Sequence, residues 1–207
     1  SVKKYGVLVV DPPWSYGATK NQRDLSRSVA KQYKVIGKGD KEINRRTGAG
    51  IQESIEFVPV LEWAKDNAHL YMWVTNPKLP FAFEVMNVWG FTYKTMLTWV
   101  KSTGAGGIHG GGMGWFFRGA TEHVLFGVRG NMPIPSSLRR PNAFLAPPTG
   151  HSVKPDAFYS LVETVSLDLD RIDVFARKQR AGWDVYGDEV ENSPGCFDST
   201  IIENEAS

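Results

Sequence analysis

The sequence contains a single cysteine, Cys196, among its 207 residues, which excludes a disulfide framework and a cysteine-based metal site. It contains no run of about eighteen apolar residues, so a membrane-spanning helix is not expected. No charged-then-apolar secretory leader precedes the first expected strand. The net charge is only +2, which does not by itself indicate a polyanionic partner. These features favour a cytoplasmic globular protein without a bound metal or a membrane anchor.

Tryptophan is by contrast abundant, with seven in the chain, and 42% of the residues are apolar. A chain of this length and composition has enough apolar surface for one substantial core. We therefore expect one domain over residues 1–190, followed by an acidic, disordered tail over 191–207. Some tryptophans belong to the core, and others offer flat faces of the kind on which nucleic-acid bases stack.

Two segments interrupt the expected domain. A basic insertion is expected over 20–50, where residues 20–46 carry nine Lys or Arg against three carboxylates, a net charge of +6. It is either a solvated, mobile insertion or an arm that contacts nucleic-acid phosphates through residues such as Lys31 and Lys34. The second segment, 104–114, has seven glycines in eleven residues and predicts a loop, either a linker or a lid that orders on substrate binding.

Elsewhere strand and helix patterns alternate, which predicts an α/β fold with a mostly parallel sheet and helices on both faces. Expected strands cover 7–10, 69–74, 93–100, 122–128 and 171–176, and expected helices cover 51–65, a stretch from Leu79 to a stop at Gly90, and 155–165. The buried faces of the last two helices are predicted to contain Leu79, Phe83 and Met86, and Phe158, Leu161, Val162 and Val165. Pro59 is expected to kink or restart the first helix, and 130–150 is predicted to be a loop.

The stretch VLVVDPPWSY, residues 7–16, places polar chemistry directly after an apolar strand. Pro12 and Pro13 end the strand, because neither donates a ladder hydrogen bond. Asp11 and Trp14 are thereby expected at the carboxyl edge of the sheet, where open α/β folds bind ligands. Asp-Pro-Pro can also be an ordinary turn and Trp14 a core residue, so these residues alone leave both interpretations open.

The functional interpretation concerns an exocyclic amino group on a nucleobase, whose lone pair is delocalised into the ring. The Asp11 carboxylate and the Pro12 carbonyl, each accepting one amino hydrogen, would localise that lone pair and make the nitrogen nucleophilic. Pro13 fixes the direction of the Pro12 carbonyl, and Trp14 offers an apolar face to the base. Such a site acts by positioning and electrostatics and needs no strongly shifted pKa.

The DPPW sequence after an apolar strand resembles the signature of amino-methyltransferases that use S-adenosylmethionine. Further segments resemble the MT-A70 adenine N6-methyltransferase family, and above all its compact prokaryotic and phage members. They are YMWVTNP (71–77), WGFTYKTMLTWVK (89–101), TEHVLFGVRGN (121–131), HSVKPDAFY (151–159) and VFARKQRAGWDVYGDEV (174–190). The resemblance implies a permuted Rossmann-like methyltransferase fold, in which the catalytic strand precedes the cofactor strand.

The resemblance also implies roles for residues that bind the cofactor. Lys154, next to a helix amino terminus, would hold the methionine carboxylate of S-adenosylmethionine. Asp173 is expected near the cofactor's amino group, and Arg177, Asp188 and Glu189 at its ribose and adenine. Two positions depart from the family pattern. Asp188 stands where Asn is common, which affects affinity alone because Asp still accepts from hydroxyls. Val153 replaces a basic residue or histidine, which weakens the case for the neighbouring His151.

Substrate contacts are implied at Tyr16, Trp115, Arg118 and Glu122, in addition to the basic insertion. The implied function is methylation of adenine N6 in DNA, with S-adenosylhomocysteine as product, by an enzyme that associates with the nucleoid when bound to DNA. The same chemistry on RNA is one alternative, because no residue named here reads a 2′-hydroxyl. Another is a non-catalytic nucleic-acid-binding subunit, which the intact DPPW and Lys154 speak against. Cytosine N4 methylation is disfavoured, since those enzymes more often carry Ser-Pro-Pro-Tyr. Family members often pair, so a homodimer is among the expected assemblies.

Overall fold

A computed structural model of the protein describes residues 2–14, 60–150, 153–166, 168–187, 190–191 and 193. Its elements in chain order are β1 (Tyr5–Val10), α3 (Val60–Trp63), β2 (Ala64–Val74), η1 (Asn76–Lys78), α4 (Leu79–Val88), β3 (Thr92–Lys101), β4 (Thr121–Arg129), η2 (Ser136–Leu138), β5 (Ala143–Ala146), α5 (Asp156–Val165), β6 (Arg171–Val174) and β7 (Asp184–Tyr186). The seven strands form one sheet in the order β5-β3-β4-β2-β1-β6-β7.

The sheet is mostly parallel, as predicted, and β1 lies near its centre. β1 pairs in parallel with β2 on one side and β6 on the other, so that Val9 faces both Tyr71 and Asp173. β4 pairs antiparallel with both β2 and β3, and is the one described strand that runs in the reverse direction. β5 and β7 pair in parallel with β3 and β6 at the two edges. The carboxyl ends of six strands and the amino end of β4 therefore share one edge of the sheet.

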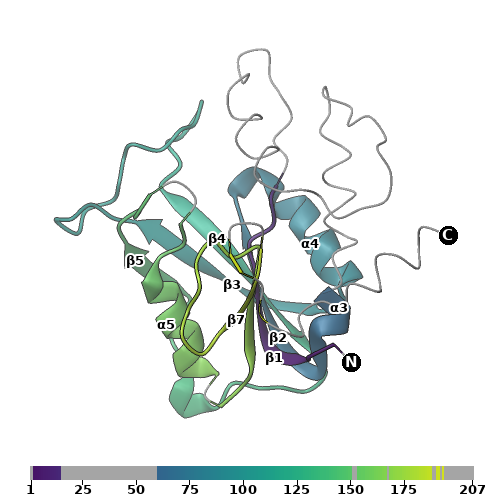
Figure 1. The fold of residues 1–207 in the computed structure, drawn as a ribbon. Helices are drawn as coiled ribbons and strands as arrows, with labels where there is room; N and C mark the ends of the chain where they lie inside the picture. Colours follow the sequence, from purple (N-terminus) through teal and green to yellow (C-terminus); the bar gives the residue numbers. More distant parts are fainter. Residues whose placement is uncertain are drawn as a thin grey trace.

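Helices cover both faces of this sheet, as Figure 1 shows with α5 on one side and α3 and α4 on the other. The side chains of β1 alternate between the two cores. Val7 and Val9 pack in the core that contains Phe158 of α5. Leu8 and Val10 pack in the opposite core with the residues of α3 and α4. β1 is buried along its whole length because apolar layers lie on each side of it, which explains its continuous apolar sequence.

The five predicted strands are confirmed, and two short edge strands were missed. β5 lies inside the stretch 130–150 that was predicted to be a loop. It has four residues between prolines and pairs with β3 alone, so its sequence carries little strand signal. β7 has three residues and pairs with β6. The segment 104–114 contains no helix or strand in the structure, in agreement with its glycine content.

The predicted helices differ in detail from those observed. α3 begins directly after Pro59 but ends at Trp63, because Ala64 already pairs with Tyr5 in the sheet; the rest of the predicted helix, 51–59, lies outside the described residues. Phe83 of α4 is 39% exposed, and Ala82 and Val85 are buried instead. In α5, Tyr159 takes the buried place predicted for Leu161. No helix in the described ranges is long and apolar enough to cross a membrane.

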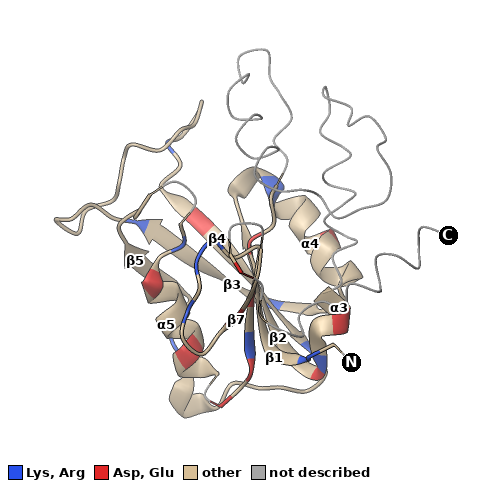
Figure 2. Ribbon diagram, viewed as in Figure 1, with Lys and Arg blue, Asp and Glu red and all other residues tan. Residues whose placement is uncertain are grey.

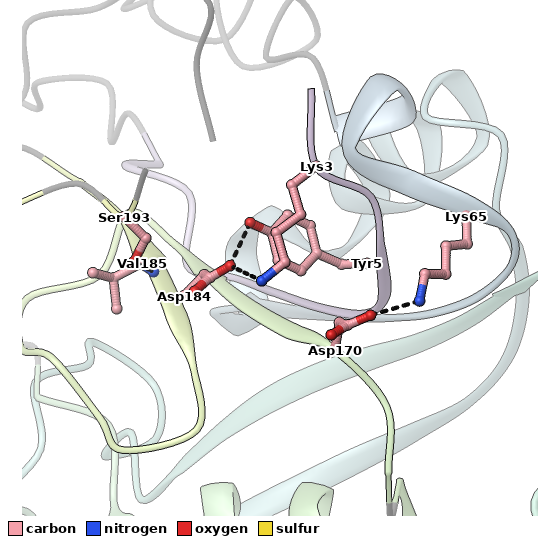
Figure 3. A network of polar contacts seen from close by, with 7 residues as sticks. All are labelled: Lys3, Tyr5, Lys65, Asp170, Asp184, Val185 and Ser193. Atoms are coloured by element: carbon pink, nitrogen blue, oxygen red, sulfur yellow. Dashed lines mark hydrogen bonds and ion pairs between the residues drawn. The ribbon is translucent and has the colours of Figure 1, made fainter. Parts of the chain in front are cut away.

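A polar network ties the edge strand β7 and the loop before β6 to the rest of the sheet (Figure 3). Lys3 Nζ and the Tyr5 hydroxyl both donate to Asp184 Oδ2, each at 2.7 Å. Lys65 Nζ lies 2.7 Å from Asp170 Oδ2, and this hydrogen bond lowers the pKa of Asp170. Ser193 belongs to the predicted tail, yet its backbone N–H donates to the Val185 carbonyl. Most of the remaining tail lies outside the described residues.

Candidate active site

The turn after β1 is fixed by hydrogen bonds on both sides. The Asp11 N–H donates to the Val174 carbonyl of β6 at 3.2 Å, which extends the parallel pairing by one residue. The Trp14 N–H donates to the Pro12 carbonyl at 2.8 Å and closes a tight turn around Pro13. The carbonyl oxygen has a second lone pair, so it remains able to accept another donor. The predicted carboxylate and carbonyl therefore stand on a rigid backbone at the sheet edge.

Trp14 anchors this turn to the protein core. Its indole N–H donates to the Trp73 carbonyl at 2.8 Å, and its ring meets Phe81 edge-on. Only 5% of Trp14 is exposed. The geometry therefore assigns Trp14 the task of holding the turn in place, and leaves little of its ring as a surface for a base.

Four charged side chains form a continuous chain at this edge. Lys154 Nζ lies 3.3 Å from Asp11 Oδ1 and 2.9 Å from Glu122 Oε2. Lys101 Nζ lies 2.7 Å from Glu122 Oε1. Each of the four side chains is less than a quarter exposed. Lys154 also lies over the ring of Trp73, 4.7 Å from its centroid. Three residues predicted from separate segments, Asp11, Glu122 and Lys154, are thus brought together, whereas Lys101 was not predicted.

Burial and charge act against each other on this chain. Burial raises the pKa of Asp11, and the neighbouring Lys154 only partly offsets it. Burial also acts to raise the pKa of Glu122, but Lys154 and Lys101 outweigh it and the pKa is lowered. For Lys154 burial favours the neutral form, yet Asp11 and Glu122 hold its pKa above the ordinary value. Glu122 and Lys154 are therefore charged at neutral pH.

Asp173 of β6 is the second buried carboxyl at the site. The Tyr159 hydroxyl donates to Asp173 Oδ2 at 2.8 Å, and the Arg180 guanidinium stacks on the Tyr159 ring at 3.6 Å. Burial raises the pKa of Asp173 to about 7, although the hydrogen bond from Tyr159 acts to lower it. Tyr159 was not predicted as a site residue. The sequence signal was the Tyr159 hydroxyl on an otherwise apolar helix face, because a buried tyrosine hydroxyl usually has a hydrogen-bond partner.

The raised pKa of Asp173 predicts a pH-dependent gain in stability for Asp173→Asn. A carboxyl whose pKa is higher in the folded chain than in the unfolded one destabilises the fold as pH rises from about 4 to about 7. Asn cannot ionise, and its carbonyl still accepts from Tyr159. The free energy of unfolding, measured with urea, should rise by about 4 kcal/mol at pH 8 and by about 1.5 kcal/mol at pH 5.

Asp66→Asn is the matched control, because the Asp66 side chain is 94% exposed and should show no such change. An Asp173→Asn effect that is equal at the two pH values, or larger at pH 5, would contradict a buried, weakly acidic Asp173.

Asp11 and Asp173 line one pocket, which is partly open to solvent. Three of the residues predicted to bind the cofactor are described by the structure, and all three line this pocket: Lys154, Asp173 and Arg177. Tyr159 and Phe175 line it as well. Asp188 and Glu189 lie outside the described residues, as do His151, Tyr16, Lys31 and Lys34. The lining combines a cation for a carboxylate, a carboxyl for hydroxyl or amino donors, and an aromatic ring. This donor set fits an amino-acid-bearing nucleoside such as S-adenosylmethionine.

The floor of the pocket depends on an unusual backbone. Phe175 has φ of 63°, the left-handed region that non-glycine residues rarely adopt, directly after β6. Gly187 follows β7 and packs so closely on this turn that a side chain there would collide with the backbone of Ala176. A strained residue at a ligand pocket is typical of functional sites, because packing elsewhere holds it in place.

Trp115 and Arg118 lie apart from this charged chain. They belong to the segment 103–120 between β3 and β4, which extends away from the sheet beside β5 (Figure 1). Trp115, Phe116 and Phe117 are each at least 90% exposed. Arg118 is the only Lys or Arg in this segment, and Asp and Glu are absent from it (Figure 2). This segment, called the aromatic loop below, starts after Lys101 and ends before Thr121, next to Glu122, so it leaves and rejoins the sheet at the same edge as the charged chain.

Comparison with known proteins identifies the family. Residues 5–189 match the MT-A70 family model. The chain belongs to the MT-A70 family. The resemblance seen in the sequence is confirmed, and with it the α/β methyltransferase fold. Methyltransferases of this family use S-adenosylmethionine. The described residues contain no group of three or more His, Cys, Asp or Glu able to hold a metal ion.

Individual relatives within this MT-A70 family include bacterial and eukaryotic proteins. The type II methyltransferase M.MunI of a Mycoplasma species is 31% identical over 199 residues, which cover 92% of this chain and 80% of that protein. The human N(6)-adenosine-methyltransferase catalytic subunit METTL3 is 25% identical over 191 residues, 91% of this chain but 28% of METTL3. The Drosophila melanogaster MT-A70-like protein is 25% identical over 194 residues, 91% of this chain and 27% of that protein. The chain thus spans most of one relative and little more than a quarter of the other two.

Proposed function

We propose that the protein transfers a methyl group from S-adenosylmethionine to N6 of adenine in DNA. The observation that carries the proposal is the pocket in which the Asp11 carboxyl, at the head of the DPPW turn, opens beside Lys154 and Asp173. A target amino group held at Asp11 would therefore lie next to the residues expected to hold the methyl donor. When bound, the cofactor supplies an electrophilic methyl group on its sulfonium.

The chain's own residues then act on the adenine. The Asp11 carboxylate and the free lone pair of the Pro12 carbonyl accept one amino hydrogen each, which localises the nitrogen lone pair. Lys154 would bind the methionine carboxylate and Asp173 would accept from a donor group of the cofactor. With the methyl donor bound, the amino nitrogen would form its bond to the methyl carbon as the sulfur–carbon bond breaks, and the surplus proton would leave to solvent. The rate gain comes from positioning and electrostatics.

We favour DNA as the substrate because the chain matches the type II methyltransferase M.MunI at 31% identity over 80% of that protein. Its match to METTL3, an adenosine N6-methyltransferase by name, has 25% identity and covers only 28% of METTL3. The target adenine must leave the base stack, at a cost of a few kcal/mol, or be met unpaired. The deciding experiment incubates the protein with methyl-labelled cofactor and matched DNA and RNA oligonucleotides. N6-methyladenine in DNA supports the proposal. Label in RNA alone would assign the same chemistry to RNA, and label in neither would overturn the proposal.

The non-catalytic alternative makes a different prediction at the same pocket. A binding subunit needs no methyl donor, so it would not titrate with S-adenosylmethionine in a calorimeter. The DPPW turn, Lys154 and the pocket beside Asp173 are all present, which favours an active enzyme. Measurable heat of binding together with methyl transfer excludes the subunit interpretation.

The aromatic loop is expected to bind the nucleic acid. Exposed aromatic rings gain about 1–3 kcal/mol for each base that stacks on them. Trp115→Ala should therefore weaken binding to a fluorescently labelled duplex by about tenfold, without a change in the affinity for S-adenosylhomocysteine. Ile108→Ala is the matched control, because Ile108 is an exposed side chain of the same loop without a ring. Equal losses in the two variants, or none in either, would contradict base stacking by Trp115.

A further inference from the structure

Lys101 ends the family-like segment 89–101, but it was not predicted as a site residue, and the proposed mechanism leaves it without a role. It stands at the end of β3, the strand neighbouring β4, and reaches Glu122 across the strand pair at 2.7 Å. Its position is fixed by more than this ion pair. The Lys101 N–H donates to the Ala120 carbonyl, its own carbonyl accepts from His109, and its ammonium lies 5.1 Å from the ring centroid of Trp99.

Glu122 accepts from a different lysine on each carboxylate oxygen. Lys101 holds Oε1, and Lys154 approaches Oε2 at 2.9 Å. The contact with Lys101 therefore orients the Glu122 carboxylate, and this orientation determines the position of the Lys154 ammonium. Lys154 lies closer to Glu122 than to Asp11, at 2.9 Å against 3.3 Å. Glu122 thus draws the ammonium group partly away from the carboxyl that the proposed reaction needs as an acceptor.

We propose that Lys101 is a positioning residue: by fixing Glu122 it holds Lys154 between two carboxylates and keeps Asp11 open to the target amino group. This inference rests on the proposed function, since it assigns Asp11 the acceptor role. Lys101 is not among the residues that line the pocket, so it would act through Glu122 and Lys154.

The charge balance explains why a lysine is needed at this place. The groups that face Glu122 are Lys101 from β3, Lys154 from the segment before α5, Asp11 from β1 beyond Lys154, and His123 on its own strand. Without Lys101, Glu122 would lose one of its two cations, and its pKa would rise because burial favours the neutral form. Once Glu122 is protonated, Asp11 is the one carboxylate partner left to Lys154. Lys154 would then tighten its existing 3.3 Å contact with Asp11 Oδ1 and compete with the target amino group for the carboxylate.

The test compares Lys101→Met with Lys101→Arg across a pH range. We expect Lys101→Met to lower kcat by about tenfold or more near pH 6, because small displacements of groups at the reacting centre reduce the rate strongly. We also expect the acid limb of its pH–rate profile to move to higher pH. Lys101→Arg keeps the charge and should restore the wild-type profile. Lys65→Met is the matched control, because Lys65 also pairs with an aspartate at 2.7 Å but at the opposite edge of the sheet. An unchanged pH profile in Lys101→Met would overturn the proposal.

A second measurement tests the role of Lys101 without relying on enzyme activity. In protein carrying ¹³C-labelled glutamate, an NMR titration of the Glu122 carboxyl should show a higher pKa in Lys101→Met than in the wild type and in Lys101→Arg. The same titration in Lys65→Met should match the wild type. A wild-type protein without methyl transfer would overturn the proposed function, whereas an active wild type whose Glu122 pKa is insensitive to Lys101 would overturn this inference alone.

Discussion

Asp11→Ala should reduce the rate of methyl transfer to adenine by about 10²–10³, the usual cost of removing one group that hydrogen-bonds to the transition state. The Pro12 carbonyl would remain as the only acceptor, so the amino group would lose half of the arrangement that localises its lone pair. Lys154 would stay in place, because Glu122 holds it at 2.9 Å. The affinity for S-adenosylhomocysteine, measured by calorimetry, should therefore change little.

Asp11→Asn sharpens this test. The amide oxygen can still accept one hydrogen bond, but without the negative charge, so we expect an intermediate rate. Both variants should be assayed in single turnover with saturating labelled cofactor, which separates the chemical step from binding and release. An Asp11→Ala enzyme with the wild-type single-turnover rate would show that the carboxyl at the head of the DPPW turn does not act on the amino group.

Lys154→Met should weaken both the fold and the binding of the cofactor. It would leave Asp11 and Glu122 as neighbouring buried carboxylates without the cation they share. Breaking a buried ion pair in this way costs about 3 kcal/mol of unfolding free energy. The loss should be greater at pH 8 than at pH 5, because the pKa of both carboxyls would rise and protonation would relieve the repulsion. Urea unfolding at the two pH values measures it.

Cofactor binding gives a second readout for Lys154→Met. A hydrogen bond to a charged group is worth about 1.5–3 kcal/mol, so the affinity for S-adenosylhomocysteine should fall by about 10- to 100-fold. Lys65→Met removes an exposed pair and should cost less than about 1 kcal/mol, with no change in that affinity. A Lys154→Met protein that unfolds and binds like the wild type would remove Lys154 from the site.

The sequence predicted the centre of the sheet better than its edges. β1 is apolar throughout because it is buried on both faces, and a short β-branched run followed by two prolines has few other interpretations. β5 and β7 have only four and three residues and pair on one side each, so their residues carry no comparable pattern. The end of α3 at Trp63 could not be predicted either, because it is set by the pairing of Ala64 with Tyr5, a contact between distant parts of the chain.

The candidate site was predictable where a motif marks a strand end. Asp11, Lys154 and Asp173 all line one pocket. The catalytic and cofactor-binding roles that the family resemblance implies for them stay predictions. Tyr159 and Lys101 were missed because their roles arise from contacts: one with a buried carboxyl across the helix–sheet interface, the other across a strand pair. Trp14 illustrates the reverse case, since its place in the motif suggested a surface for the base, while its burial and its hydrogen bond to Trp73 give it a task in holding the turn.

The reversed direction of β4 has a consequence for how this enzyme can diversify. A connection between two parallel strands must run back along the length of the strands to the opposite edge of the sheet. The connection between the antiparallel strands β3 and β4 instead begins and ends beside the charged chain. Residues added to or removed from 103–120 would reshape the rim where we propose that the substrate binds, and would leave the pairing between the strands intact. We therefore expect exchange of this segment between relatives to change how the nucleic acid is bound while the sheet and the charged chain stay as they are.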